Sequence, residues 1–255
     1  MNAIADIGGR APRWRDTLAL PLDTIPLLDR MVVRSVALVG SSHISRIKGL
    51  EHVLPDRDPL ILVLNHSTKL EAILVPAMLM LLRRGRHVHF LADWNFKLVP
   101  GVSLLYHCAR VITVPNKDAR PRFLNALKPL LTSDVSPMDE ARAKLLAGHS
   151  VGIFPEGTVN RDRVNLLRGR LGAARLSLQT GVPVVPAGLR YPSAPAGCRI
   201  PEGSPMEIEF GPAMMPPSIE REPGAAQLRD WHVEIMTAIG TLSQKFPSSG
   251  KGDDA

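Results

Sequence analysis

Short apolar runs alternate with segments of helical periodicity through most of this sequence. Six of the runs have the length of a buried strand, and they lie at residues 60–64, 87–91, 111–114, 151–154, 182–189 and 206–210. Their apolar residues are nearly continuous, which is typical of strands that are covered on both faces. We therefore predict an α/β fold in which a largely parallel central sheet is flanked by helices, with a helical segment at the N-terminus.

Three helical patterns surround these strands. Residues 27–39 are apolar around most of the helical circumference, and Arg30 and Arg34 lie on one face of that helix. Ser136 and Pro137 begin a second helix that Gly148 ends, and residues 228–242 keep the spacing of a last amphipathic helix. The first helix either packs on the core or lies in a lipid interface with its arginines at phosphates.

These patterns divide the 255 residues into four parts. Residues 1–44 form an N-terminal segment with the candidate membrane-interface helix, and residues 45–225 form one medium-sized α/β domain. The C-terminal amphipathic helix takes residues 226–247. The Ser, Gly, Lys and Asp content of the tail 248–255 predicts that the tail is disordered.

The charge of the chain indicates an anionic partner. Lys and Arg number 31 against 24 Asp and Glu, a formal charge of +7, which suits nucleic acid, lipid headgroups or phosphorylated small molecules. Aromatic residues make up only 4%, too few for extensive base stacking, so we do not expect a nucleic-acid partner. No segment has the roughly 18 to 20 apolar residues that a membrane span needs.

Cysteine usage indicates a reducing compartment. Cys108 and Cys198 are the only cysteines, and the chain begins without a recognisable secretory signal, so we expect a cytoplasmic protein. Cys108 is interpreted as a half-buried structural residue. His87 and His89 point the same way on a predicted strand, but no acidic or cysteine partner has suggestive spacing, so we expect no metal site.

The first candidate for chemistry is the segment 65–71, which follows a buried strand directly. His66 and Glu71 would lie about 140° apart on one continuous helix and would not meet. They meet if the strand ends near Asn65 and a turn delivers Glu71 into the first turn of the next helix. Both would then lie at the carboxyl end of a strand, where open α/β sheets bind ligands. Otherwise His66 is a structural histidine beside an unrelated glutamate.

The second candidate, residues 154–161, also follows a predicted strand. Gly157 allows close backbone approach to a ligand, Thr158 offers a hydroxyl, and Arg161 offers a cation that matches phosphate oxygens. An ordinary tight turn before a solvated basic stretch is the alternative. Farther along, Pro183 and Pro186 interrupt an apolar run, which indicates an edge strand, an irregular strand or a cavity wall.

These three elements together resemble the glycerolipid acyltransferase family, typified by the 1-acylglycerol-3-phosphate acyltransferases. The resemblance covers about residues 48–192. The family's first block matches Asn65, His66 and Glu71, although most members have Asp in place of the glutamate. Its later blocks match residues 154–158 with Arg161, and Val182 with Pro183 and Pro186.

One block departs from the family pattern. The arginine that ends the family's second block falls at or near Asn116, so Lys117 or Arg120 is the neighbouring cation for an acceptor phosphate. A lysine lacks the bidentate geometry of arginine. The departure makes a phosphate-free acceptor, such as a lyso-aminolipid, the alternative to a lysophospholipid.

The resemblance implies an acyltransferase that moves a fatty acyl group from acyl-CoA or acyl-acyl-carrier-protein to a hydroxyl of a lysophospholipid, such as 1-acylglycerol-3-phosphate. The reaction would serve phospholipid biosynthesis or remodelling. His66 would be the general base and Glu71 would orient it. No cofactor or metal is implied beyond the acyl donor as co-substrate. The residues expected to bind substrate are Asn65, Glu156, Gly157, Thr158, Arg161 and Lys117.

The remaining expectations concern the surroundings of this chemistry. The partners would be the lysolipid acceptor, acyl-CoA or acyl carrier protein, and an anionic membrane surface, with the protein peripheral at the inner face of a membrane. Part of the apolar segment 72–82 is a candidate wall of an acyl-chain channel. A catalytically inactive lipid-binding member and a nucleic-acid-binding module are the competing interpretations of the whole chain.

Overall fold

The structure is a computed structural model that describes residues 13–22, 24–99, 101–115, 117–195, 198–218 and 222–247. Two sequence-based predictions fall outside these residues: the disorder of the tail 248–255, and the place of Asn116 at the family's arginine position.

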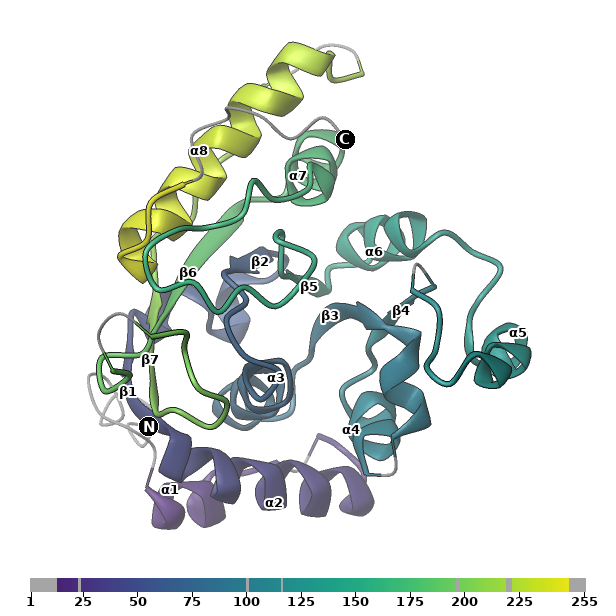
Figure 1. The fold of residues 1–255 in the computed structure, drawn as a ribbon, viewed down its shortest axis with the longest axis vertical. Helices are drawn as coiled ribbons and strands as arrows, with labels where there is room; N and C mark the ends of the chain where they lie inside the picture. Colours follow the sequence, from purple (N-terminus) through teal and green to yellow (C-terminus); the bar gives the residue numbers. More distant parts are fainter. Residues whose placement is uncertain are drawn as a thin grey trace.

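A seven-stranded sheet forms the centre of the molecule (Figure 1). Its strands lie in the order β1-β7-β6-β2-β5-β3-β4, and neighbouring strands from β6 through to β4 run parallel. β7 is antiparallel to β6, and β1 is parallel to β7. The prediction of a largely parallel sheet is therefore confirmed. The strands are β1 (Ile44–Lys48), β2 (Ile61–Leu64), β3 (Val88–Asp93), β4 (Ile112–Val114), β5 (Ser150–Ile153), β6 (Val184–Arg190) and β7 (Met206–Phe210).

The six apolar runs correspond to β2 through β7 within a few residues at each end, whereas β1 was not predicted. Of the five residues of β1, only Ile44 and Ile47 are buried, because β1 lies at the edge of the sheet. An edge strand lacks the continuous apolar run that a strand covered on both faces shows. The alternative that Pro186 marks an edge strand is wrong, because β6 lies between β7 and β2. Pro186 has no backbone N–H, but it lies one residue before the first β6–β7 pair, Ala187 with Phe210.

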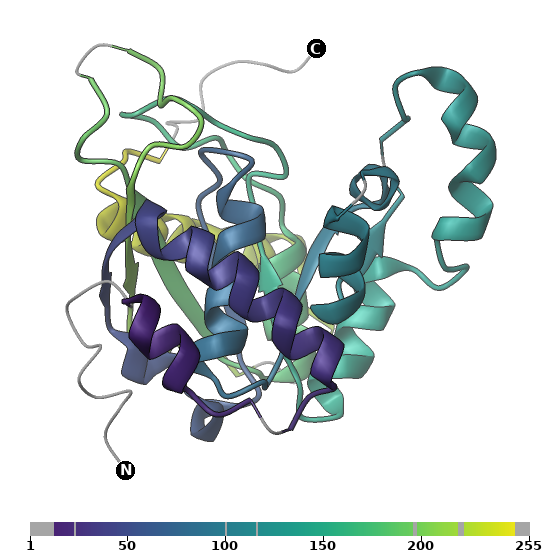
Figure 2. The same cartoon turned by 90° about the horizontal axis from the view of Figure 1, so that it is seen from below.

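Helices cover both faces of the sheet (Figures 1 and 2). On one face lie α6 (Pro137–Leu146), α7 (Gly172–Thr180) and α8 (Ala225–Ser243). On the other lies α3 (Glu71–Leu82), with α2 (Leu27–His43) packed across it. In the view of Figure 2, α2 runs diagonally across the molecule. The shorter helical segments are α1 (Trp14–Ala19), η2 (Leu50–His52), η3 (Pro55–Arg57), η4 (Trp94–Leu98), α4 (Val102–Cys108), η5 (Arg122–Leu127) and α5 (Lys128–Leu131).

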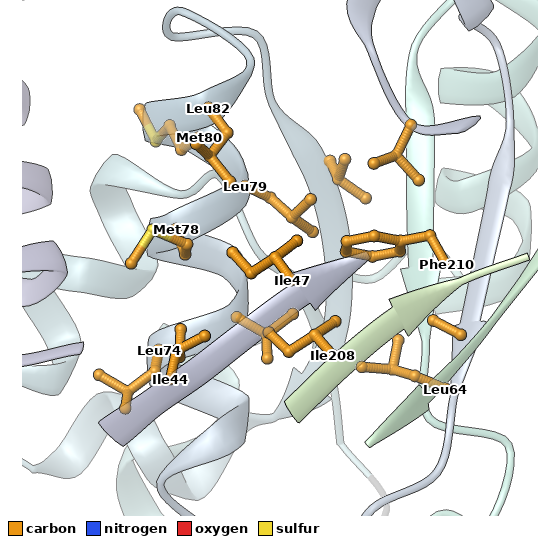
Figure 3. Packing of buried hydrophobic residues seen from close by; sticks show 14 of the residues in the cluster. Ile44, Ile47, Leu64, Leu74, Met78, Leu79, Met80, Leu82, Ile208 and Phe210 are labelled. Atoms are coloured by element: carbon orange, nitrogen blue, oxygen red, sulfur yellow. The ribbon is translucent and has the colours of Figure 1, made fainter. Parts of the chain in front are cut away.

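The core between the sheet and α3 fixes the helix that carries the predicted acid. Ile47 of β1 and Ile208 of β7 pack against apolar side chains of α3, among them Leu74 and Met78 (Figure 3). The outer side of α3 is covered by α2, where the nearest heavy atom to a Cβ built on Gly40 would be a Leu74 methyl carbon at 3.4 Å. Because α3 is buried along almost its whole length, the position of Glu71 at its N-terminus is rigidly set. In the described ranges, no helix is both long enough and apolar enough to cross a membrane.

Candidate active site

The turn between β2 and α3 brings His66 and Glu71 together. β2 ends at Leu64 and α3 begins at Glu71, so the chain between them folds back and places the imidazole Nδ1 2.7 Å from Glu71 Oε1. This is the arrangement that the sequence required if the two residues were to meet. Glu71 is fully buried in the first turn of α3, where the helix dipole favours a carboxylate.

Both oxygens of Glu71 are engaged by protein groups. Oε1 accepts a hydrogen bond from the backbone N–H of Ser67 as well as from His66, and Oε2 accepts one from the hydroxyl of Tyr191. Thr68 Oγ1 lies 3.5 Å from Oε2. Burial, with the nearby Glu71 carboxylate, raises the pKa of Tyr191, so its hydroxyl keeps its proton and remains a donor. The carboxylate is thus held in one orientation.

The imidazole of His66 has one nitrogen left for chemistry. The carboxylate accepts the Nδ1 proton, which fixes the tautomer with Nε2 unprotonated. No described residue forms a hydrogen bond with Nε2. The ring packs against Phe154, with 4.5 Å between the centroids. A histidine held in this way can take a proton from a ligand at Nε2.

The second motif supports the backbone of His66. Glu156 is buried, and its Oε1 accepts the His66 backbone N–H at 2.9 Å. Its Oε2 accepts from Asn160 Nδ2 at 2.7 Å and from the backbone N–H of Leu167 at 2.9 Å. The backbone N–H of Asn160 in turn donates to the His66 carbonyl. We predicted Glu156 as a substrate ligand, but in the structure both of its oxygens bind protein groups and hold the two turns together.

Asn65 lies in the framework as well. Its side-chain amide accepts the backbone N–H of Leu189 at 2.7 Å and donates to the Leu189 carbonyl at 3.0 Å. It therefore ties the end of β2 to β6, away from the cavity that His66 faces.

A cavity of about 670 Å³ opens beside His66. Its apolar wall includes side chains of β3, η4, α4 and β4 and of the residue before β4, namely Phe90, Leu91, Phe96, Tyr106, Val111 and Val114. Its polar groups include Lys69, Asp93, Lys117, Thr158 and Arg170. Of the segment 72–82, which we considered as a channel wall, only Ala72 borders the cavity, because the rest of α3 packs in the core.

The predicted substrate-binding residues divide between this cavity and other places. Gly157, Thr158 and Lys117 border it. Gly157 has φ of +66°, and a Cβ there would lie 3.0 Å from Arg170 Nε, so a larger residue would disturb both the turn and the arginine. Arg161 does not border the cavity and forms an ion pair with Glu202 instead.

Lys117 is the cation that the sequence analysis placed near the acceptor phosphate. Its ammonium lies 3.7 Å from Asp93 Oδ2 and donates to the Gly157 carbonyl at 3.4 Å. Burial raises the pKa of Asp93. The cavity wall therefore carries a lysine with a carboxylate beside it.

The sequence analysis missed three residues of this site. Tyr191, just after β6, binds Glu71, and Lys245, just after α8, donates to Ser67 Oγ at 2.9 Å. They lie 120 and 178 residues along the chain from their partners, and no local pattern marks them. Arg170 had a partial signal, since it belongs to the arginine-rich stretch after the second motif.

Two other candidates have structural surroundings. The rings of His87 and His89 stack with 5.8 Å between centroids, and each ring bonds a backbone carbonyl, of Cys108 and Arg110 respectively. Burial lowers the pKa of His89 to about 4, so it is neutral near pH 7. Burial raises the pKa of the Cys108 thiol to about 11, which makes it a poor nucleophile.

Comparisons with known proteins give a family match and a similar fold. A family model described as Acyltransferase matches residues 45–190. The fold is similar to the crystal structure of the 1-acyl-sn-glycerophosphate (LPA) acyltransferase PlsC from Thermotoga maritima, with a TM-score of 0.53 and 18% sequence identity over 85% of this chain and 80% of that one. A search among curated proteins finds no match.

Proposed function

The chain belongs to the acyltransferase family, and on this premise we propose that it transfers a fatty acyl group from a thioester donor to a hydroxyl of a glycerolipid. The observation that carries the proposal is the 2.7 Å contact between His66 and the buried Glu71 at the wall of a large, mainly apolar cavity. In the proposal the donor is acyl-CoA or acyl-acyl-carrier-protein. The acceptor is a lysophospholipid such as 1-acylglycerol-3-phosphate, the substrate class named for the PlsC structure.

The chemistry follows from the tautomer of His66. Nε2 takes the proton of the acceptor hydroxyl as its oxygen attacks the thioester carbonyl, and Glu71 stabilises the imidazolium that forms. When the tetrahedral intermediate collapses, the C–S bond breaks and the thiolate takes the proton from the imidazolium. The products are the ester and the free thiol of the donor. Because the thioester is already activated, no acyl-enzyme is needed.

The cavity suits the two ends of such substrates. Aromatic and aliphatic side chains of β3, η4, α4 and β4 offer an apolar wall for a fatty acyl chain. Lys69, Lys117 and Arg170 bring positive charge to the same cavity, and Thr158 adds a hydroxyl, as a phosphate headgroup requires. We assign the acyl chain to the first region and the headgroup to the second.

A lyso-aminolipid acceptor is the second candidate. Lys117 is already close to Asp93, and this carboxylate places a negative charge on the cavity wall. Such a wall favours an acceptor with an amino group more than a wall of cations alone would. The interpretation as an inactive lipid-binding protein would be favoured if His66 and Glu71 lay apart, and the 2.7 Å contact between them removes that support.

We also propose that α2 attaches the protein to the inner face of a membrane. Leu27 and Met31 are 68% and 60% exposed, and Leu28 and Val39 are also exposed. An apolar surface of this kind on one helix suits a lipid interface. The sequence placed Arg30 and Arg34 at lipid phosphates if this helix lies in an interface. In the structure Arg30 Nε donates to the Ile25 carbonyl and Arg34 Nη2 to the Leu20 carbonyl.

The test is an acyl-transfer assay with purified protein against a panel of lysophospholipids and lyso-aminolipids, each with acyl-CoA and with acyl-acyl-carrier-protein. His66→Ala should lose about 10²- to 10⁴-fold in turnover, as expected when a general base is removed. His107→Ala, which changes an exposed histidine outside the cavity, is the matched control and should keep activity. A folded His66→Ala enzyme with intact acyl transfer would refute the proposal.

A further inference from the structure

The segment after α8 places a lysine inside the protein. The chain turns back at Gln244, and Lys245 is only 5% exposed. The next residue, Phe246, pairs its backbone with Val164 and Leu166, with hydrogen bonds of 2.7 and 2.8 Å. The C-terminal segment is thereby tied to the loop that follows the second motif.

The approach of α8 to the sheet sets the position of this lysine. At Gly188 of β6, a Cβ would collide with the backbone of Leu242 near the end of α8, so only glycine allows the helix to lie this close. The ammonium of Lys245 consequently reaches the turn between β2 and α3. There it donates to Ser67 Oγ at 2.9 Å.

Ser67 connects Lys245 to the His66–Glu71 pair. The backbone N–H of Ser67 donates to Glu71 Oε1, the same oxygen that accepts the Nδ1 proton of His66. Ser67 is fully buried, and its hydroxyl also lies 3.3 Å from Asn65 Nδ2. A continuous set of hydrogen bonds therefore runs from the C-terminal segment to the imidazole.

Three carboxylates attract the ammonium of Lys245, but in the described part of the chain it forms no ion pair with any of them. Within the described ranges, no carboxylate lies within ion-pair distance of its ammonium, and burial lowers its pKa despite the attraction of Glu156, Glu71 and Asp162. A buried ammonium without a close counter-ion costs folding stability. A charge kept at such a cost indicates a functional use.

We propose that Lys245 is a positioning residue of the active site: it holds Ser67 so that its N–H and the imidazole N–H meet one oxygen of Glu71, and its charge offsets the carboxylates around His66. The proposal rests on the proposed acyl transfer. Lys245 lies outside the residues 45–190 that the family model matches, so the family match does not supply this role.

The effect on His66 follows from the local charges. Glu71 contacts its ring and Glu156 contacts its backbone. Removal of the Lys245 charge would leave these two carboxylates without the cation that now lies near them. The charged and titratable groups that face Lys245 or share the small cavity beside it are Glu71, Glu156, Asp162, Tyr191, Lys48, Arg163, Arg190 and Glu207.

The test compares Lys245→Met with Phe246→Ala in the full chain. Met keeps the length of the side chain and removes the charge, whereas Phe246→Ala removes an exposed side chain from the same segment and is the control. For Lys245→Met we expect kcat near pH 7 to fall about tenfold with KM nearly unchanged, since a misplaced base slows the chemical step. The acidic limb of the kcat profile should move to higher pH, and the melting temperature should stay the same or rise.

Several further results decide the outcome. Ser67→Ala removes the acceptor of the Lys245 hydrogen bond and should lower kcat in the same way, which keeps the proposal testable if Lys245→Met does not fold. An unchanged kcat and pH profile, or a loss of activity that follows a loss of thermal stability, would overturn it.

If the wild-type chain transfers no acyl group, the proposed function fails by itself. The NMR resonance of the His66 Nδ1 proton then tests the link to Lys245, and a resonance that does not move in Lys245→Met overturns it.

Discussion

Two turns at the carboxyl ends of neighbouring strands hold His66, and each uses a buried glutamate in a different way. In the turn after β2, Glu71 binds the imidazole ring. In the turn after the neighbouring strand β5, Glu156 binds the backbone N–H of the same histidine. The comparison shows that residue type and place at a strand end do not define a role. The part of the histidine that each carboxylate contacts distinguishes an acid that acts on the base from one that holds the chain.

The largest expected effect is on kcat, and it comes from removing the charge of Glu71 in the first turn. In Glu71→Gln the N–H of Ser67 keeps the amide oxygen at the place of Oε1, so His66 retains its tautomer but loses the negative charge beside it. We expect kcat to fall about 100-fold or more with little change in KM, because the imidazolium forms only during the reaction. Steady-state kinetics of acyl transfer with the best acceptor of the panel measures this effect.

Two observations check the interpretation of that variant. Its circular dichroism should match that of the wild type. Its melting temperature should fall less than that of a variant that opposes two N–H groups, because the Tyr191 hydroxyl that faces the new amide NH₂ can turn to accept from it. A Glu71→Gln enzyme with wild-type kcat would show that Glu71 is only a structural partner of His66, and the contrast between the two turns would disappear.

Glu156→Gln should have a smaller effect on turnover and a larger one on stability. Both oxygens of Glu156 accept N–H groups, so one of these donors would face the amide NH₂ of Gln. Loss of such a buried, charge-assisted hydrogen bond costs about 1–3 kcal/mol. We expect a melting temperature lower by several degrees. We also expect kcat to fall about tenfold, because the backbone of His66, and the imidazole with it, moves when this hydrogen bond is lost.

The opposite result would restore the role that the sequence suggested for Glu156. If Glu156→Gln melts like the wild type and raises KM for the acceptor without lowering kcat, the carboxylate contacts the headgroup. The same experiment with Asp230→Asn, on an exposed residue of α8, controls for a general effect of removing negative charge.

The sequence was sufficient for the parts of this site that depend on neighbouring residues. Strands covered on both faces leave continuous apolar runs, and the positions of His66 and Glu71 after one such run determined that a turn had to separate them. β1 could not be predicted in this way, because an edge strand buries only some of its side chains. The family resemblance added the acyl-transfer chemistry, which periodicity alone does not contain.

The parts that were missed depend on contacts between distant segments. Tyr191 reaches Glu71 across 120 residues, and Lys245 reaches Ser67 across 178. Sequence spacing also cannot tell whether a polar side chain at the end of a strand turns towards a cavity or towards the framework. For that reason Asn65, Glu156 and Arg161 were predicted together with Thr158, although only Thr158 of these four borders the cavity.

Thr158 provides the smallest and most specific test of the second turn. Its side chain is exposed at the cavity, and within the described part of the chain its hydroxyl has no hydrogen-bond partner. Thr158→Val keeps the shape and removes this hydroxyl, so we expect KM for the acceptor to rise about two- to tenfold, the value of one hydrogen bond, with kcat and melting temperature unchanged. Kinetics at varied acceptor concentration measures the change. A fall in kcat together with stability would instead make Thr158 part of the framework, as Glu156 is, and would leave the second turn without a substrate contact from its hydroxyl.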